Sequence, residues 1–469
     1  MSGRLLIKNG CVITVDEKLG NFPRADVLVE NGKIVAVQPD LPVSDAEVVD
    51  ATGMIVLPGF VDTHRHMWEA LIRGIGADWS LVTYLRLIYF EGLGGTLRPQ
   101  DLYIANLLGA LEALDAGVTT VFDWSMCETP EHADGLIQGL QESGCRVVFA
   151  YGTGLKNAAA YWSQESTLTH PEDARRVRSQ YFSSDDQLVT MALAIRGAEF
   201  SPLDITRRDI ELARELGVIA SMHIGVGTNG PAQRAITRMH EAGLLGPDLN
   251  FVHGTTVTDD ELRMVADSGG SISICPEVEM QMGHGFPPIN RCLAVGLRPT
   301  FGVDVVVSTG GDMFAQMKAA VMVARGLVND TFLRRNEMPE KLNLPVDEVL
   351  KFATIDGARA LKLDHKVGSL TPGKEADIVL LRTDTINQVP LVNPVGTVVL
   401  TANTANVDTV FVRGQAVKRH GQLVGVDMNR LRRLAQDSLE YVFSTWGLPE
   451  GAWEPLFPGT TDKKLAPTG

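Results

Sequence analysis

The feature that most constrains the fold is a series of eight short apolar segments between residues 59 and 304. They are rich in Val, Ile and Phe, which is typical of buried strands. Helical patterns, such as those at 101–117 and 205–217, separate most of them. Eight strand–helix units over about 300 residues predict a (β/α)8 barrel. The expected strands lie at 59–64, 117–124, 146–152, 188–195, 217–224, 249–254, 271–276 and 297–304.

The segments on either side of these units have a different pattern. Two apolar runs near the N-terminus carry Asn-Gly, at 9–10 and 31–32, the strongest short signal for a hairpin. Strand and turn patterns return at 367–381 and 407–425. We therefore expect an α/β protein whose barrel is inserted in a small β-sandwich domain. The expected boundaries are 1–57 and 364–426 for the β-sandwich, 58–363 for the barrel, and 427–469 for a C-terminal helix and extended tail.

Charge and cysteine usage exclude several classes of partner. The net charge is −15, which disfavours nucleic acid, since phosphate backbones bind surfaces rich in Lys and Arg. The five cysteines are scattered and include no C-x-x-C pair, so neither a disulfide framework nor a thiolate metal site is expected. Neither a signal peptide nor a membrane-spanning run is recognisable. We expect a cytoplasmic protein without a membrane partner, and a homodimer or higher homo-oligomer.

Histidines mark the ends of several expected strands. His64 and His66 are two residues apart at the end of the first strand, so in a strand they share one face. Taken alone, such a pair fits a metal site and two ordinary polar histidines equally well. His223 ends the fifth strand, His253 the sixth, and Asp304 the eighth. Because these ends meet at the barrel mouth, four repetitions favour a metal site over coincidence.

Four motifs carry a resemblance to a known family. They are PGFVDTHRHMWEALIRG at 58–74, FVHGTTVTDDEL at 251–262, FGVDVVVSTGGDMFAQM at 301–317, and ATIDGARALKLDHKVGSLTPGKEADIVLL at 353–381. Together they resemble the amidohydrolase superfamily, in the branch of cytosine deaminase, guanine deaminase and the triazine hydrolases. The resemblance covers nearly the whole chain.

The resemblance implies a ligand set and a reaction. His64, His66, His223 and Asp304 would bind the metal, and Asp304 would also accept a proton from the metal-bound water. His253 would hydrogen-bond that water or the substrate. The fourth strand has no lysine to bridge two metals, so one divalent ion is expected, Zn²⁺ or alternatively Fe²⁺. Such an ion makes hydroxide available at neutral pH, and the implied reaction is hydrolysis of a C–N bond, as in deamination of a small N-heterocycle.

The sequence departs from this branch at one position. Its deaminases carry a glutamate three residues after the fifth-strand histidine, where this chain has Val226, which cannot transfer a proton. Glu279, after the seventh strand, is the candidate catalytic acid, because it replaces a neutral residue in a loop that should face the metal. Glu277 and Glu199 are alternatives, and each of the three could equally be a solvated loop carboxylate.

Further residues near the strand ends are candidates for substrate binding. Glu69 and Trp68 follow the first strand, Arg196 ends the fourth, and His284 lies after the seventh. The alternatives are a structural ion pair for Arg196 and packing or polar filling for the others. A long insertion at 154–187 follows the third strand and is a candidate lid.

Two other functions are compatible with the sequence. The first is hydrolysis of a ring amide or of an aryl substituent such as halide, which leaves without a proton. The second is a non-catalytic barrel that serves as a scaffold, which the intact set of metal-type residues disfavours.

Overall fold

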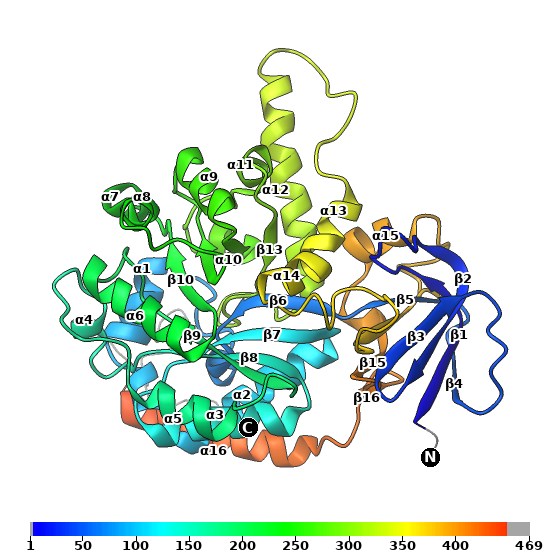
Figure 1. The fold of residues 1–469 in the computed structure, drawn as a ribbon, viewed down its shortest axis with the longest axis horizontal. Coiled ribbons are helices and arrows are strands. Elements are labelled where there is room, and N and C mark those ends of the chain that lie inside the picture. Colours follow the sequence, from blue (N-terminus) through cyan, green and yellow to red (C-terminus); the bar gives the residue numbers. More distant parts are fainter. Residues whose placement is uncertain (1–2, 448–469) are drawn as a thin grey trace, which may run out of the picture.

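The computed structural model describes residues 3–447, and its largest part is a barrel of parallel strands (Figure 1). Each strand pairs with the next in chain order. A parallel bridge between Arg65 and Asp304 nearly closes the barrel. The expected (β/α)8 fold is therefore confirmed. The strands are β6 (Phe60–Arg65), β7 (Val118–Trp124), β8 (Arg146–Tyr151), β9 (Val189–Ala194), β10 (Ala220–Ile224), β11 (Leu249–His253), β12 (Ser271–Ile274) and β13 (Pro299–Phe301).

Helices outside the barrel follow the individual strands. The longer ones are α2 (Pro99–Asp115), α3 (Pro130–Ser143), α5 (Asp173–Tyr181), α6 (Leu203–Leu216), α8 (Ala235–Glu241), α9 (Asp259–Ser268) and α12 (Met313–Leu333). Helix α6 buries Thr206, Ile210 and Ala213, whose spacing places them on one face. It ends at Gly217, which adopts the left-handed φ of 68° that glycine tolerates. The helices expected at 101–117 and 205–217 are thus confirmed.

Short helical segments lie in the loops and after the barrel. Those before the fifth barrel strand are η1 (Met67–Ile72), α1 (Leu81–Tyr84), η2 (Leu85–Phe90), η3 (Gly94–Thr96) and α4 (Ala158–Tyr161). Those that follow are α7 (Asn229–Gln233), α10 (Pro276–Gln281), α11 (Ile289–Ala294), α13 (Val346–Lys351), η4 (Phe352–Asp356), α14 (Gly357–Ala360), α15 (Pro394–Gly396), η5 (Thr397–Thr401) and η6 (Thr404–Asn406). Several of them belong to the loops above the C-terminal ends of the strands, where barrels place their sites.

The small β-domain is one mixed sheet built from both ends of the chain. Strand β5 (Met54–Pro58) pairs antiparallel with β14 (Ile378–Arg382) and so joins the two halves. A second hydrophobic cluster, separate from that of the barrel, includes Val27, Val56 and Leu380. The remaining strands are β1 (Arg4–Val12), β2 (Phe22–Glu30), β3 (Lys33–Gln38), β4 (Glu47–Asp50), β15 (Val407–Val412), β16 (Gln415–Arg419) and β17 (Gln422–Leu423). The exact domain boundaries stay predictions.

The two Asn-Gly pairs have different outcomes. Asn31 and Gly32, with φ of 51° and 77°, form the turn between β2 and β3, as expected for a hairpin. Asn9 and Gly10 lie inside β1 instead, where the register with β2 shifts between Ile7 and Gly10. The turn expected at Asn9-Gly10 was therefore predicted wrongly, although β1 and β2 do pair antiparallel. An Asn with φ of 64° followed by glycine also fits a bulge, in which an extra residue bends one strand.

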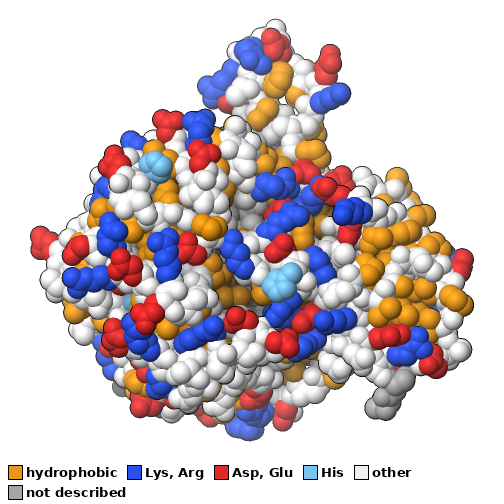
Figure 2. Space-filling model, viewed as in Figure 1, with side chains coloured by type: hydrophobic (Ala, Val, Ile, Leu, Met, Phe, Trp, Pro, Cys, Tyr) orange, Lys and Arg blue, Asp and Glu red, His pale blue; other side chains and the backbone are white. Residues whose placement is uncertain are grey.

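The C-terminal helix is confirmed as α16 (Met428–Trp446), which lies along α2. The expected extended tail, at 448–469, lies outside the described residues. In the part of the chain that the structure describes, no helix has both the length and the apolar character needed to cross a membrane. Acidic and basic side chains are interspersed over the barrel on the face shown in Figure 2, and hydrophobic side chains gather over the small β-domain.

Candidate metal centre and active site

Strand β6 ends with two imidazoles in the barrel mouth. His64 and His66 are both buried, and their ring centroids are 4.9 Å apart. The side chain between them points away, since Arg65 donates to Glu112 Oε2 at 2.5 Å and to the Gly311 carbonyl at 3.1 Å. Strand alternation therefore explains the His-Arg-His sequence: two histidines face the mouth and the arginine faces α2.

Three other strands bring their predicted residues to the same place. The ring centroid of His223, at the end of β10, lies 4.9 Å from that of His64. His253 is the last residue of β11 and has a φ of 73°, and Asp304 follows β13 with a φ of 66°. This left-handed conformation is uncommon for residues other than glycine. Backbone of this kind concentrates at functional sites. The structure thus assembles the predicted cluster at the C-terminal ends of four barrel strands.

Asp304 is the centre of this cluster. Its Oδ1 lies 3.2 Å from His64 Nε2 and 3.4 Å from His66 Nε2, and its Oδ2 lies 3.7 Å from His253 Nε2. Ligand atoms of His64, His223, His253 and Asp304 all lie within 4.8 Å of one another. His253, which we did not expect to be a primary ligand, is therefore as close to the group as the expected ligands. His66 contacts the group through Asp304.

The electrostatics favour three neutral imidazoles, those of His64, His66 and His223, around an ionised carboxylate. Burial lowers the pKa of His66 to about 3 and lowers that of His64 and, strongly, that of His223. Burial opposes the ionisation of Asp304, but the hydrogen bond to His64 and the charge of His253 hold its pKa well below the ordinary value. Neutral imidazole and ionised carboxylate are the forms that bind metal ions.

A buried carboxylate lies behind His253. Glu279 Oε1 is 3.1 Å from His253 Nδ1 and accepts the backbone N–H of Cys275 at 2.8 Å. Burial opposes a charge on His253, yet Glu279 and Asp304 raise its pKa above the ordinary value. Burial also raises the pKa of Glu279. Glu279, expected as an acid that meets substrate, therefore contacts His253 and is not among the residues that line the cavity.

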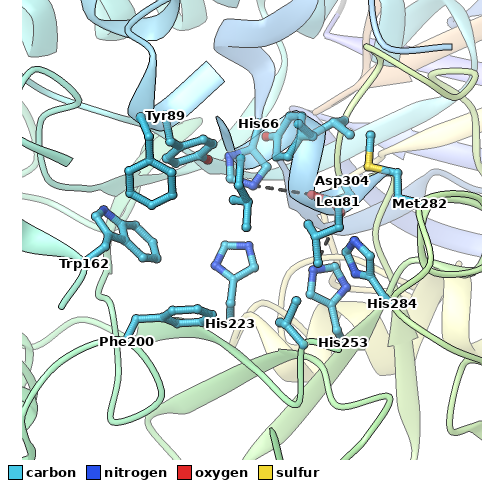
Figure 3. Close-up of a pocket in the computed structure, with 15 residues that line it drawn as sticks. His66, Leu81, Tyr89, Trp162, Phe200, His223, His253, Met282, His284 and Asp304 are labelled. Carbon is cyan, nitrogen blue, oxygen red and sulfur yellow. Dashed lines mark ion pairs between the residues drawn. The ribbon is translucent and has the colours of Figure 1, made fainter. Parts of the chain in front are cut away.

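The cavity above the cluster has an apolar wall (Figure 3). Its volume is about 680 Å³ with its open side included, a size that suits a small molecule. Tyr89, Trp162 and Phe200 lie on one side of His223, while His284 and Met282 lie beyond His253. The lining comprises His66, Leu81, Tyr84, Leu85, Tyr89, Phe90, Trp162, Phe200, His223, Val226, His253, Met282, His284, Asp304 and Val305.

Of the four expected substrate contacts, only His284 lines this cavity. Its two ring nitrogens are buried and have no hydrogen-bond partner among the described residues. Trp68 and Glu69 are fully buried behind the wall, and Glu69 accepts the hydroxyl of Tyr84 at 2.5 Å. These two residues support the wall without being part of it.

Arg196 also lies away from the cavity. It is 1% exposed and donates to the carbonyls of Tyr161 and Leu168 at 2.8 and 2.6 Å and to Asp209 at 3.1 Å. The expectation that Arg196 binds substrate is therefore wrong. The alternative, a structural ion pair, is what the structure shows, with Asp209 as the partner. Both carbonyls belong to the insertion at 154–187, so Arg196 fixes that segment to the barrel.

Val226 lines the cavity at the position where a glutamate was expected. The carboxylate of Glu199 lies beside it and accepts the backbone N–H groups of Gly225 and Val226 at 2.6 and 3.0 Å. Glu277 accepts from Gln316 Nε2 at 2.7 Å. Neither glutamate lines the cavity, so among the described residues Asp304 is the only carboxylate that does.

Sequence reasoning missed most of the apolar lining. Leu85, Tyr89 and Phe90 lie in the segment between β6 and α2, in which no residue beyond Glu69 was singled out as a substrate contact. Trp162 was included only as part of the candidate lid. Phe200, Met282 and Val305 follow strands or loops with no pattern of their own, and only their place in the fold reveals them.

Comparisons with known proteins add independent findings. A model of the amidohydrolase family matches residues 55–417. A 5-methylthioadenosine/S-adenosylhomocysteine deaminase of Desulforudis audaxviator is 30% identical over 448 residues, which are 92% of this chain and 97% of that protein. A 5'-deoxyadenosine deaminase of Methanothermobacter thermautotrophicus is 28% identical over 428 residues, 89% of this chain and 94% of that protein.

Solved structures show the same fold. An adenosine deaminase of Xanthomonas campestris with bound zinc has a TM-score of 0.81 at 23% identity, covering 94% of this chain and 98% of that one. An atrazine chlorohydrolase of Arthrobacter aurescens complexed with zinc has a TM-score of 0.79 at 22% identity, covering 93% of this chain and 100% of that one. At these identities the similarity establishes the architecture alone.

Proposed function

The chain belongs to the amidohydrolase family, and on that premise we propose that it uses one divalent metal ion to hydrolyse a C–N bond of a small N-heterocycle. The sequence relatives, two deaminases of adenosine-like compounds, support this reaction class. The observation that carries the proposal is the group of imidazoles around Asp304 at the C-terminal ends of the barrel strands.

The residues present fit a metal ion. We assign His64, His66, His223 and Asp304 as its ligands, because imidazole nitrogens and a carboxylate oxygen suit Zn²⁺, with Fe²⁺ as the alternative. His223 Nδ1 is buried without a hydrogen-bond partner among the described residues, and such a group is unfavourable unless something binds it. A cation would bind His223 and would also balance the charge of Asp304.

Asp304 and His253 then handle the protons. A divalent ion held by these residues would lower the pKa of water toward about 7 and so supply hydroxide at neutral pH. Asp304 would accept the proton that this water releases. His253, held by Glu279 at Nδ1, presents Nε2 to the cavity 3.7 Å from Asp304 and donates a hydrogen bond to the developing negative charge on the substrate.

The leaving group receives its proton from one of the same two residues. Val226 cannot supply it, and among the described residues no carboxylate except Asp304 lines the cavity. This observation also favours a second candidate reaction, displacement of an aryl substituent such as halide, because halide leaves without a proton. Hydrolysis of a ring amide remains within the same mechanism. A non-catalytic scaffold is set aside, because the chain belongs to a family of hydrolases and each residue of the proposed cluster is in place.

The test separates ammonia from halide as the product. The metal-loaded protein is incubated with amino- and chloro-substituted members of the same pyrimidine, purine and triazine rings, and ammonia and chloride are both quantified. Deamination predicts ammonia from the amino compounds, whereas the second candidate predicts chloride alone. Asp304→Asn is the blank. Release of neither product above that blank contradicts the proposal. The homo-oligomer and the cytoplasmic location stay predictions.

A further inference from the structure

The walls of the cavity carry few polar atoms, and this restricts what can bind there. Ten of its 15 lining residues are aliphatic, aromatic or methionine. The other five are four histidines and Asp304. Among the residues that the structure describes, no Ser, Thr, Asn, Gln, Lys, Arg or Glu lines the cavity. Three of the four histidines and Asp304 belong to the cluster described above. His284 is the one histidine of the lining that lies outside it.

The phenols do not add free partners. Tyr84 donates its hydroxyl hydrogen to Glu69 at 2.5 Å, and Tyr89 is hydrogen-bonded to Tyr84. Both hydroxyls thus already have a hydrogen-bond partner within the wall. Outside the cluster, two lining side chains therefore have ring nitrogens without a partner among the described residues, His284 and the indole N–H of Trp162. One imidazole matches one ring nitrogen or carbonyl of a heterocycle.

The apolar side of the cavity is a connected aromatic wall from three parts of the chain. Tyr84 and Tyr89 have ring centroids 5.8 Å apart, Tyr89 and Trp162 6.0 Å, and Trp162 and Phe200 5.5 Å, all at steep interplanar angles. Edge-to-face contacts of this kind fix the rings against one another. Leu81 and Met282 add further apolar side chains to the lining (Figure 3).

Trp162 is held in this wall from outside. The carbonyl of Tyr161, its neighbour in the chain, accepts from Arg196, and Gln164 donates to the carbonyls of Ala198 and Glu199 at 3.1 and 3.0 Å. The insertion is therefore fixed to the loop after β9 on both sides of Trp162. The wall is preformed, which reduces the ordering that binding requires.

We propose that this cavity selects an uncharged N-heterocycle that carries an apolar substituent and excludes nucleosides. The inference rests on the proposed function only for the position of the reacting ring carbon, which must reach the metal cluster. The substituent then lies against Tyr89, Trp162 and Phe200. A ribose in that place would find at most one indole N–H, that of Trp162, and would bury its remaining hydroxyl groups without partners. Each such group weakens binding by roughly tenfold or more.

This specificity differs from the activities for which the sequence relatives are named, deamination of 5'-deoxyadenosine and of 5-methylthioadenosine or S-adenosylhomocysteine. Those compounds are nucleosides. The chain therefore shares a reaction class with these relatives and differs from them in the part of the substrate that does not react.

The test compares ligands that share a ring and differ only in the substituent. The pairs are 9-benzyladenine with adenosine, and 1-benzylcytosine with cytidine. Binding to the metal-loaded protein is measured by equilibrium dialysis, and mass spectrometry quantifies intact ligand and product separately. We expect the benzyl member of at least one pair to bind tenfold or more tighter than its nucleoside. Equal or tighter binding of the nucleoside in either pair overturns the proposal, as does absence of binding by both benzyl compounds.

Variants identify the wall as the cause. Trp162→Ala and Phe200→Ala should each reduce the preference for the benzyl member at least threefold. Phe286→Ala removes an exposed aromatic ring outside the lining and should leave the preference unchanged. Thermal unfolding identifies a wall variant that does not fold. In that case the other wall variant alone tests the proposal. An unchanged preference in a folded wall variant overturns the proposal. A preserved preference without any product contradicts the proposed reaction but not this inference.

Discussion

Glu279 Oε1 lies 3.1 Å from His253 Nδ1, while the other nitrogen of the same ring lies 3.7 Å from Asp304 Oδ2. His253 is thus held between two carboxylates, one behind the cavity wall and one within it. This arrangement fixes the orientation of the imidazole and raises its pKa, despite the burial that opposes a charge.

Replacing Glu279 should therefore impair catalysis more than binding. We expect Glu279→Gln to lower kcat by about 10–100-fold with little change in KM, because the carboxylate orients His253 and does not touch the substrate. The alkaline limb of the pH–rate profile should move to lower pH, because loss of the Glu279 carboxylate lowers the pKa of His253, which acts in its protonated form. Glu277→Gln is the matched control, as Glu277 contacts Gln316 instead. A wild-type kcat in Glu279→Gln contradicts the role.

Arg196 should matter for stability and for the insertion at 154–187. Arg196→Met leaves Asp209 buried without its ion partner, so we expect a loss of about 3–5 kcal/mol in the free energy of unfolding. The insertion should also become sensitive to limited proteolysis. Arg175→Met is the control, because Arg175 pairs with Glu215 at the surface, where an ion pair contributes little to stability. If the two substitutions change the unfolding free energy and the proteolysis of the insertion equally, Arg196 does not fix the insertion to the barrel.

Glu199 makes the stability depend on pH. Burial raises its pKa to about 7 from an ordinary 4.5, against the two backbone N–H donors of Val226 and Gly225. Between these values the folded state binds more protons than the unfolded state, so its stability falls as pH rises and levels off above about 7. In metal-free protein, wild type should lose about 3 kcal/mol relative to Glu199→Gln between about pH 4 and pH 8.

Urea unfolding of both proteins across that pH range measures this difference. The acceptor geometry that the substitution alters contributes equally at every pH and does not affect the slope. A difference in unfolding free energy that stays constant with pH would rule out the raised pKa.

The backbone of Gly302 supports the position of His64. A Cβ atom at residue 302 would lie 2.6 Å from the His64 carbonyl oxygen and 2.9 Å from its Cβ, so the strand ends would have to move apart. We expect Gly302→Ala to lower both metal content and stability, the latter by about 1–3 kcal/mol. Gly326→Ala is the control, because nothing lies within 4 Å of its Cβ and alanine favours the helix. Normal metal content in Gly302→Ala would show that the strand ends tolerate the displacement.

The barrel and the residues of the cluster were predictable because each leaves a local signal. Apolar strands alternate with helices, and the residues at the ends of parallel strands must meet, so His223, His253 and Asp304 could be placed together from the sequence alone. The direction in which a loop side chain points leaves no such signal in the sequence. No pattern in the sequence indicates that Glu279 faces His253, or that Arg196 binds carbonyls of an insertion. The turn predicted at Asn9-Gly10 was wrong for a related reason, because the dipeptide Asn-Gly is compatible with both a turn and a bulge.

The measurement that tests the central claim most directly is the metal content of the purified protein by elemental mass spectrometry. It compares wild type with His64→Ala and Asp304→Ala, and with His365→Ala, which removes an exposed histidine, as the control. We predict about one divalent ion per chain in wild type and in the control, and its loss in the other two variants. Absence of metal in wild type, even after Zn²⁺ or Fe²⁺ is supplied, would contradict the metal-dependent mechanism, and two ions per chain would contradict the single-metal site.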